Sequence, residues 1–148
     1  MEANSTTYCL IYASTATHEM SDRELNEILA VARDRNTELD ITGLLLYADG
    51  NFIQILEGDR DRVDALYEHI ATDPRHYGAV RLMRRNTGQR HFSDWRMGFK
   101  TISANEFEER VPGFSSILHS ADERDALKDQ VSRDIWALLM SFRAVTRV

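Results

Sequence analysis

The sequence predicts an α+β fold with a mainly antiparallel sheet, two helices on one face and a C-terminal helical extension on the other. Three observations lead to this prediction. Strand-like and amphipathic segments follow each other in the order β-α-β-β-α-β. The strand-like runs are apolar on both faces, so the sheet needs a cover on each side. A chain of 148 residues with 43% hydrophobic residues is long enough to bury such a core.

The first strand and the first helix follow from the residue types. Residues 7–14 are rich in aliphatic and aromatic side chains and predict a strand. A capping box at 21–24 then opens a helix that we expect to end near Asn36. Its apolar face consists of residues at helical spacing, namely Leu25, Ile28, Leu29 and Ala32.

A β-hairpin and a second helix come next. Residues 41–47 and 51–57 are apolar runs, and the Asp49-Gly50 pair between them is typical of a hairpin turn. The second helix begins after Gly58 and ends at Asp73, because a residue that precedes proline is disfavoured in helical conformation. Its apolar face consists of Val63, Leu66, Tyr67 and Ile70.

Two more strands, predicted at 79–84 and 94–99, complete a ferredoxin-like βαββαββ order. Side chains alternate along a strand, so Tyr8, Leu10 and Tyr12 share one face. By the same alternation Gln54 shares a face with Phe52 and Leu56. The opposite faces are also apolar, with Cys9, Ile11, Ala13, Ile53 and Ile55.

The tail supplies a cover for the second face. After a loop that contains Pro112 and Gly113, a second capping box at 120–123 opens a helix. We expect this helix to dock on the far face of the sheet or to pair with another subunit, because it carries a wide apolar stripe of Leu127, Val131, Ile135, Leu138 and Phe142.

Composition excludes several classes of function. The net charge of -6, from 18 basic and 24 acidic residues, argues against a nucleic-acid surface. No apolar run has the length of a signal peptide or a membrane span, and the single cysteine, Cys9, cannot form an internal disulfide. No metal site is expected, because His69, His76 and His91 lack a metal-binding spacing. These features predict a soluble, cytoplasmic protein.

Tyr12 and Gln54 are the most informative residues, because each is a polar side chain in an apolar strand. A buried phenol or carboxamide without a partner costs roughly 1–3 kcal/mol, so the pair suggests a shared ligand or a shared network. Ile28 and Ile70 lie on the apolar faces of the two helices, where a flat apolar ligand fits between them.

Three further polar residues suit such a ligand. Asn36 offers an amide to a ring carbonyl and imide edge, and Arg35 and Arg75 offer charge-assisted hydrogen bonds to a phosphate tail. Taken singly, each residue also has a structural interpretation. Tyr12 suits a core aromatic, Asn36 a helix cap and Arg75 a surface ion pair.

Five segments resemble the BLUF domain, the flavin-binding blue-light sensor family, in the family's order and spacing. The resemblance covers roughly residues 7–100 and implies a domain at 1–100, followed by a helical extension at 101–148 for output or oligomerisation. The matching segments are 10–14, Asn36 with 41–47, 52–58, 73–76 and 92–97.

The resemblance implies a noncovalent flavin, usually FAD, with FMN and riboflavin as alternatives. It makes Tyr12 the photoactive tyrosine and Gln54 the switching glutamine. Trp95 and Met97 match a pair on the fifth strand that relays the signal, although Arg96 between them departs from the small residue common in the family. The residues expected to bind flavin are Tyr12, Ile28, Arg35, Asn36, Phe52, Gln54, Ile70, Arg75 and His76.

The resemblance implies a sensor and not an enzyme. Light drives electron and proton transfer from Tyr12 toward the flavin, and a rearranged Gln54 hydrogen bond persists. We expect output through contact of the C-terminal helix with a partner protein or a second copy, and a homo-oligomer. The alternative is a light-inactive flavin-binding or structural module of the same fold. A small phosphatase is disfavoured, because the loop at 14–19 contains no glycine to cradle phosphate.

Overall fold

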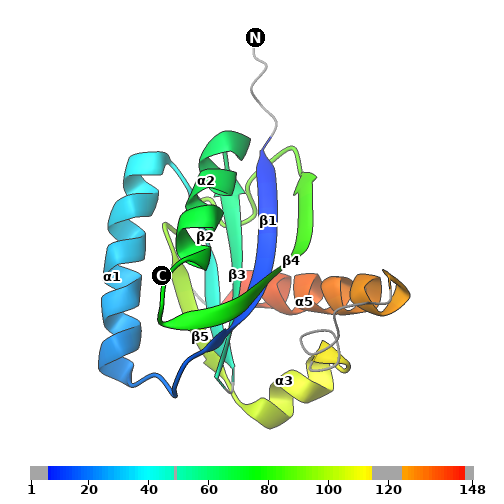
Figure 1. Ribbon diagram of the computed structural model, residues 1–148. Helices are drawn as coiled ribbons and strands as arrows, with labels where there is room; N and C mark the ends of the chain where they lie inside the picture. Colours follow the sequence, from blue (N-terminus) through cyan, green and yellow to red (C-terminus); the bar gives the residue numbers. More distant parts are fainter. Residues whose placement is uncertain (1–6, 49, 115–124, 146–148) are drawn as a thin grey trace.

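The computed structural model describes residues 7–48, 50–114 and 125–145, with side chains in the last segment described for 129–143. Figure 1 shows the arrangement of its elements. In chain order these are β1 (Tyr8–Ala16), α1 (Asp22–Leu39), β2 (Thr42–Ala48), β3 (Asn51–Gly58), α2 (Arg60–Ala71), β4 (His76–Asn86), β5 (Gly98–Ile102), α3 (Ala104–Arg110) and α5 (Asp125–Val145).

The strands form one sheet in the order β4-β1-β3-β2-β5. Every neighbouring pair is antiparallel except β2 and β5, which are parallel. The first four strands follow the ferredoxin-like arrangement, and β5 extends it beside β2, so the predicted fold class is confirmed. The register places Tyr12 of β1 directly opposite Gln54 of β3.

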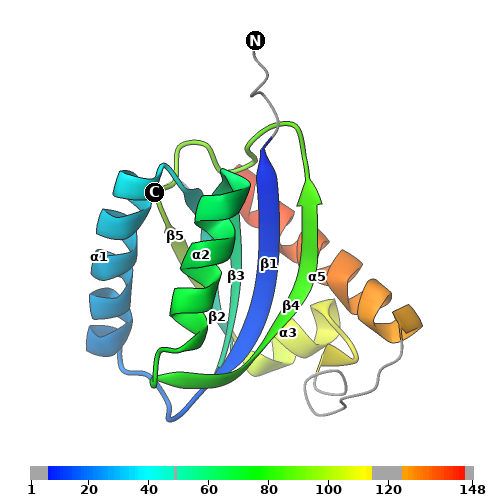
Figure 2. The same cartoon turned by 45° about the horizontal axis from the view of Figure 1, so that its top comes forward.

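Helices cover both faces of the sheet, as the two-sided apolar pattern predicted. Figure 2 shows α1 and α2 on one face, called the near face below, and α3 and α5 behind the other, the far face. Near-face residues such as Leu10 and Leu56 pack with α1 and α2. Far-face residues such as Ile11 and Ile55 pack with Ile135 and neighbouring residues of α5. The predicted docking of the C-terminal helix on the far face is therefore confirmed.

The capping box of α1 forms as predicted. The Ser21 hydroxyl accepts a hydrogen bond from the Glu24 amide at 3.1 Å, and the Glu24 carboxylate accepts one from the Ser21 amide at 2.9 Å. The helix continues past Asn36 to Leu39 and ends at Asp40, whose φ of 56° is left-handed. Asn36 thus lies within the last turn of α1, and its side chain is buried.

The prediction for the fifth strand was wrong at its start. β5 begins at Gly98, and Trp95 and Met97 lie in the loop before it. The reason is the set of hydrogen bonds that the backbone groups of this loop form. The Trp95 amide closes a turn onto the Phe92 carbonyl at 2.9 Å, and the Arg96 and Met97 carbonyls accept from side chains of α1 instead of from a neighbouring strand.

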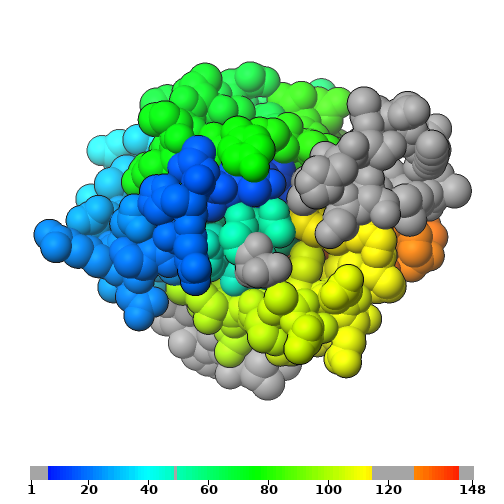
Figure 3. Space-filling model, turned by 60° about the horizontal axis from the view of Figure 1, so that its bottom comes forward, coloured from blue at the N-terminus to red at the C-terminus, as the bar shows by residue number. Residues whose placement is uncertain are grey.

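The segment between β5 and α5 also differs from the prediction. Residues 104–110 form the short helix α3, which was not predicted as a separate element, and the Ser103 hydroxyl caps it by accepting from the Glu106 amide at 3.2 Å. Figure 3 shows α3, in yellow, at one end of the molecule, together with the loop after β1, in blue. The capping box predicted at 120–123 lies outside the described residues.

Truncation of a far-face contact should weaken the fold. Leu138 of α5 is fully buried in the far-face core, so Leu138→Ala should lower the free energy of unfolding by about 2–5 kcal/mol. Urea unfolding followed by circular dichroism measures this. Arg133→Ala, at an exposed position of the same helix, should change stability by less than about 0.5 kcal/mol. Equal small effects would show that α5 contributes little to the core.

Candidate functional site

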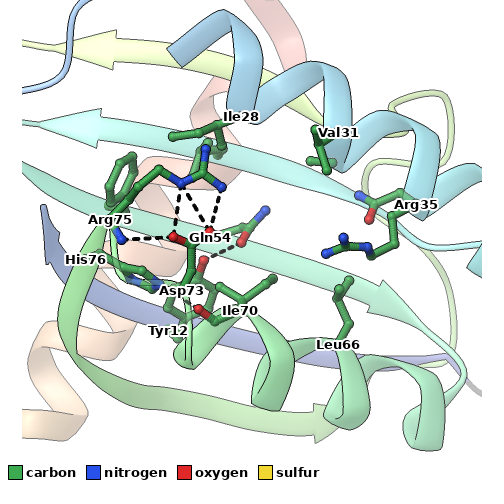
Figure 4. A pocket seen from close by; sticks show the side chains of 14 residues that line it. Tyr12, Ile28, Val31, Arg35, Gln54, Leu66, Ile70, Asp73, Arg75 and His76 are labelled. Atoms are coloured by element: carbon green, nitrogen blue, oxygen red, sulfur yellow. Dashed lines mark hydrogen bonds and ion pairs between the residues drawn. The ribbon is translucent and has the colours of Figure 1, made fainter. Parts of the chain in front are cut away.

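A pocket opens on the near face between α1, α2 and the sheet, as Figure 4 shows. Six elements contribute to it: β1, α1, β2, β3, α2 and the start of β4, together with the turn that follows α2. All nine residues predicted to bind flavin line this one pocket, namely Tyr12, Ile28, Arg35, Asn36, Phe52, Gln54, Ile70, Arg75 and His76. The fold thus brings together residues that are up to 64 positions apart in the sequence.

Tyr12 and Gln54 form a direct hydrogen bond at the floor of the pocket. The Tyr12 hydroxyl donates to Gln54 Oε1 at 2.5 Å, and both side chains are buried. Burial, aided by the nearby Tyr67 and Asp73, raises the pKa of the Tyr12 phenol far above its ordinary value. The phenol is therefore protonated and acts as the donor in this bond.

The other end of the Gln54 amide points to Met97. Gln54 Nε2 donates to Met97 Sδ at 3.2 Å, and the Met97 side chain is buried in the near-face core. A thioether is a weak acceptor, so this hydrogen bond holds the amide much less strongly than the bond to Tyr12 does. Trp95 points the other way, into the far-face core, where its ring packs on Phe92 at a centroid distance of 5.3 Å.

Asn36 connects the pocket to the loop before β5. Its side chain is buried, and Nδ2 donates to the Arg96 carbonyl at 2.6 Å. The amide group carries a second N–H and an acceptor oxygen, which can serve a ligand with adjacent donor and acceptor groups. Asn36 therefore suits a ring edge and also positions the loop that holds Met97.

The two pocket arginines lie at opposite ends of the pocket, as Figure 4 shows. Arg75 binds Asp73 through Nε at 3.0 Å and Nη2 at 2.6 Å. This hydrogen bonding holds the pKa of the Asp73 carboxyl at about 2, so the pair is charged at neutral pH. Arg35 lies next to Asn36, at the other end. The two arginines therefore cannot serve the same group of a small ligand.

His76 has both ring nitrogens occupied by protein groups. Nε2 lies 2.7 Å from the Ile70 carbonyl, which can only accept, so we assign the proton to Nε2. Nδ1 then accepts from the Ser14 hydroxyl at 2.6 Å. These bonds tie the end of α2 to β1, so His76 fixes the position of Ile70 and contributes its ring to the pocket wall.

Five lining residues were not among the predicted site residues: Val31, Ala32, Leu45, Leu66 and Asp73. Ala32 and Leu66 had been placed on the apolar helix faces, which is the signal that could have identified them. Leu45 lies opposite Gln54 in the β2–β3 register, which the hairpin turn fixes. Val31 is 51% exposed and carries no sequence signal, since an apolar residue at the mouth of a pocket looks like any surface valine.

The chemistry of the lining fits a planar ring with one polar edge. Ile28 and Ile70 provide apolar walls, and the amides of Asn36 and Gln54 face the same space with donors and acceptors. The cleft measures about 670 Å³ with its open side included.

Two other features, a metal site and a membrane-spanning helix, are absent from residues 7–48, 50–114 and 125–145. No group of three or more His, Cys, Asp or Glu side chains in these ranges could hold a metal ion. No helix in them is both long and apolar enough to cross a membrane.

Curated proteins similar to this chain include a photoactivated cyclase subunit and a blue light-regulated antirepressor. Photoactivated adenylate cyclase subunit beta of Euglena longa is 47% identical over 77 residues, which is 52% of this chain and 9% of that protein. The blue light- and temperature-regulated antirepressor BluF of Escherichia coli (strain K12) is 30% identical over 129 residues, 87% of this chain and 30% of that protein. The chain thus spans less than a third of these relatives.

Solved structures similar to this chain include two small proteins. The photo-activated state of BlsA has a TM-score of 0.74 at 26% identity, over 96% of this chain and 98% of that one. The dark-state structure of the BLUF protein BlrB has a TM-score of 0.65 at 29% identity, over 90% of this chain and 98% of that one.

The family model described as sensors of blue light using FAD matches residues 7–98, the segment that contains the Tyr12–Gln54 bond and the whole pocket lining. The chain belongs to this family, the BLUF sensors.

Proposed function

We propose that the near-face pocket is the flavin site of this blue-light sensor and that Tyr12 and Gln54 are its photoactive pair. The observation that carries the proposal is the 2.5 Å bond between the Tyr12 hydroxyl and Gln54 Oε1 in the pocket lining. A bound flavin supplies the absorption of blue light and, when excited, the power to oxidise a phenol. The residues of the chain then determine what change persists after illumination.

Gln54 is suited to hold two arrangements. In the structure its Oε1 accepts from Tyr12 and its Nε2 donates to Met97. Rotation or tautomerisation of the amide exchanges these ends, and the Tyr12 hydroxyl can accept as well as donate. When Tyr12 gives up an electron and its phenolic proton, it loses the donor that fixes the Gln54 orientation. The amide can then settle in the other arrangement, which is a population shift between two states.

We propose separate roles for the two pocket arginines. Asn36 and Gln54 would hold the polar edge of a flavin ring, and Arg35, next to Asn36, would serve this edge as well. Arg75, at the opposite end of the pocket, would hold the phosphate-bearing tail through charge-assisted hydrogen bonds. The cofactor in the cell is proposed to be FAD, as the family description states. Among the similar structures, Klebsiella pneumoniae BlrP1 was determined with FMN.

The output is proposed to be a change in protein contacts without substrate turnover, in the cytoplasm. Met97 lies in the near-face core and Trp95 in the far-face core, so a shift of the loop that holds both residues acts on each core. The far-face core includes Ile135 and Leu138 of α5. The segment 101–148 is therefore proposed to act as the output element, through a partner protein or a second copy.

The photochemistry is tested first by visible absorption before and after blue light. The wild-type protein should contain flavin, show a small red shift and recover in darkness. Tyr12→Phe and Gln54→Leu should bind flavin without the shift, because each removes one partner of the 2.5 Å bond. Tyr77→Phe, at a side chain that is 59% exposed, should behave like the wild type. Flavin without any shift in the wild type would instead indicate a light-inactive module.

The roles of the arginines are tested by titrating flavins into the flavin-free protein and following fluorescence quenching. Arg75→Gln should weaken FMN about 10- to 150-fold and leave riboflavin nearly unchanged, because a lost charge-assisted bond costs roughly 1.5–3 kcal/mol. Arg35→Gln should weaken both by the same factor. Arg62→Gln, outside this pocket, is the matched control. Selective loss of FMN in Arg35→Gln would reverse the assignment.

The output proposal is tested with dark and illuminated samples of the whole chain. Light scattering should report a change in association, and hydrogen exchange in α5 should change between the two states. Gln54→Leu serves as the control, since it should leave both readouts unaffected by light. If the wild type gives the same mass and the same exchange in both states, α5 is not the output element.

A further inference from the structure

A second buried tyrosine lies directly behind Tyr12. Tyr67 of α2 is 6% exposed, and its ring centroid is 5.2 Å from that of Tyr12, with the ring planes tilted by 59°. Tyr67 is not among the residues that line the pocket. Its ring therefore contacts that of Tyr12 in a tilted arrangement from outside the pocket.

This contact creates a problem for a light-driven reaction at Tyr12. Two phenol rings at this separation can exchange an electron, and they have similar intrinsic ease of oxidation. When light has removed an electron from Tyr12, an electron can therefore pass from Tyr67 to Tyr12. Tyr67 is then the oxidised residue. The oxidised Tyr67 side chain does not contact Gln54, so it cannot drive the rearrangement of the Gln54 amide.

The guanidinium group of Arg81 lies over the ring of Tyr67. Its guanidinium carbon is 4.6 Å from the Tyr67 ring centroid, and Arg81 pairs with Tyr12 across β4 and β1. The neutral ring attracts this cation, but a ring that has lost an electron repels it. Arg81 therefore makes Tyr67 harder to oxidise than Tyr12. The carboxylate of Glu68, 2.7 Å from Arg81 Nη2, offsets part of this effect but lies at the exposed end of the guanidinium.

Hydrogen bonding alone does not account for the position of Arg81. Its Nε atom is buried and has no hydrogen-bond partner, while only Nη2 reaches Glu68. A buried donor without a partner is costly, and the contact with the ring holds the guanidinium together with the ion pair to Glu68. The two observations together indicate that the cation is positioned for the ring of Tyr67.

We propose that Arg81 is a positioning residue of the photoreaction. By opposing the oxidation of Tyr67, Arg81 keeps Tyr12 as the residue that stays oxidised after light absorption. The proposal rests on the proposed role of Tyr12 as the light-oxidised residue.

The reaction that Arg81 opposes balances as follows. After one electron has left Tyr12 for the chromophore, and before the Tyr12 proton leaves, one electron passes from Tyr67 to Tyr12 and leaves a radical cation on the Tyr67 ring, beside Arg81. Tyr12 keeps its phenolic proton and regains its original state. Tyr67 then loses its own phenolic proton to water and becomes a neutral tyrosyl radical. The net change is one electron and one proton lost by Tyr67, with the electron retained by the chromophore and the Gln54 switch not engaged.

The test combines the yield of the red-shifted state with electron paramagnetic resonance of illuminated samples that contain ring-deuterated tyrosine. Arg81→Gln should lower the yield about threefold, in line with a cation–π interaction of ordinary strength, and should produce a long-lived tyrosyl radical. Adding Tyr67→Phe to that variant should remove the radical and restore the yield. Arg81→Lys, which keeps the cation, should stay close to the wild type.

Further outcomes separate this role from a merely structural one. If Arg81→Gln fails to fold, Tyr67→Trp with Arg81 in place decides, because tryptophan is oxidised more easily and should lower the yield where Tyr67→Phe does not. An Arg81→Gln protein without the radical, or a double variant whose yield stays low, overturns the proposal. Absence of any red shift in the wild type would instead overturn the proposed role of Tyr12.

Discussion

The register between β1 and β3 is the constraint on which the rest of the molecule depends. It sets Tyr12 opposite Gln54 and turns both toward α1 and α2. Because side chains alternate with a period of two, a slip of one residue would move either side chain into the far-face core. There a phenol or an amide would lie among aliphatic groups, and Cys9 or Ile11 would occupy the pocket side instead. The apolar residues of both faces therefore hold the polar pair in register.

The parts of this structure that depend on local pattern could be predicted from the sequence. Alternation along the strands and helical spacing identified both cores, and the docking of α5 followed from the wide apolar stripe around Ile135. The start of β5 could not be predicted, because the Arg96 and Met97 carbonyls are satisfied by side chains of Asn36 and Arg33, about 60 positions away. A strand-like residue pattern at 94–97 does not reveal such partners. Asp73 was also missed as a site residue, since its position before proline already explained it.

The loop before β5 is the physical connection between the two cores. Three consecutive carbonyls are held: that of Trp95 by the Gly43 amide, that of Arg96 by Asn36 and that of Met97 by Arg33. The Trp95 and Met97 side chains leave this backbone toward opposite faces of the sheet. Because the carbonyls are fixed, one side chain cannot be displaced without straining contacts of the other. Such a segment links the pocket to α5 through packed atoms, which is the kind of contiguous path that coupling between sites can use.

A comparison of two polar residues on β3 explains why only one of them is suited to switch. Glu57 is fully buried, and its carboxylate accepts from the Thr42 hydroxyl and from the backbone amides of His91 and Phe92. These donors fit one orientation, and any other leaves buried groups unpaired, so Glu57 is rigid. Gln54, three residues earlier on the same strand, has one strong partner in Tyr12 and one weak partner in Met97. Its amide has a donor end and an acceptor end of similar shape, so exchanging them preserves packing and changes only the hydrogen bonds. In the proposed mechanism, a change at Tyr12 decides which of these two arrangements is populated.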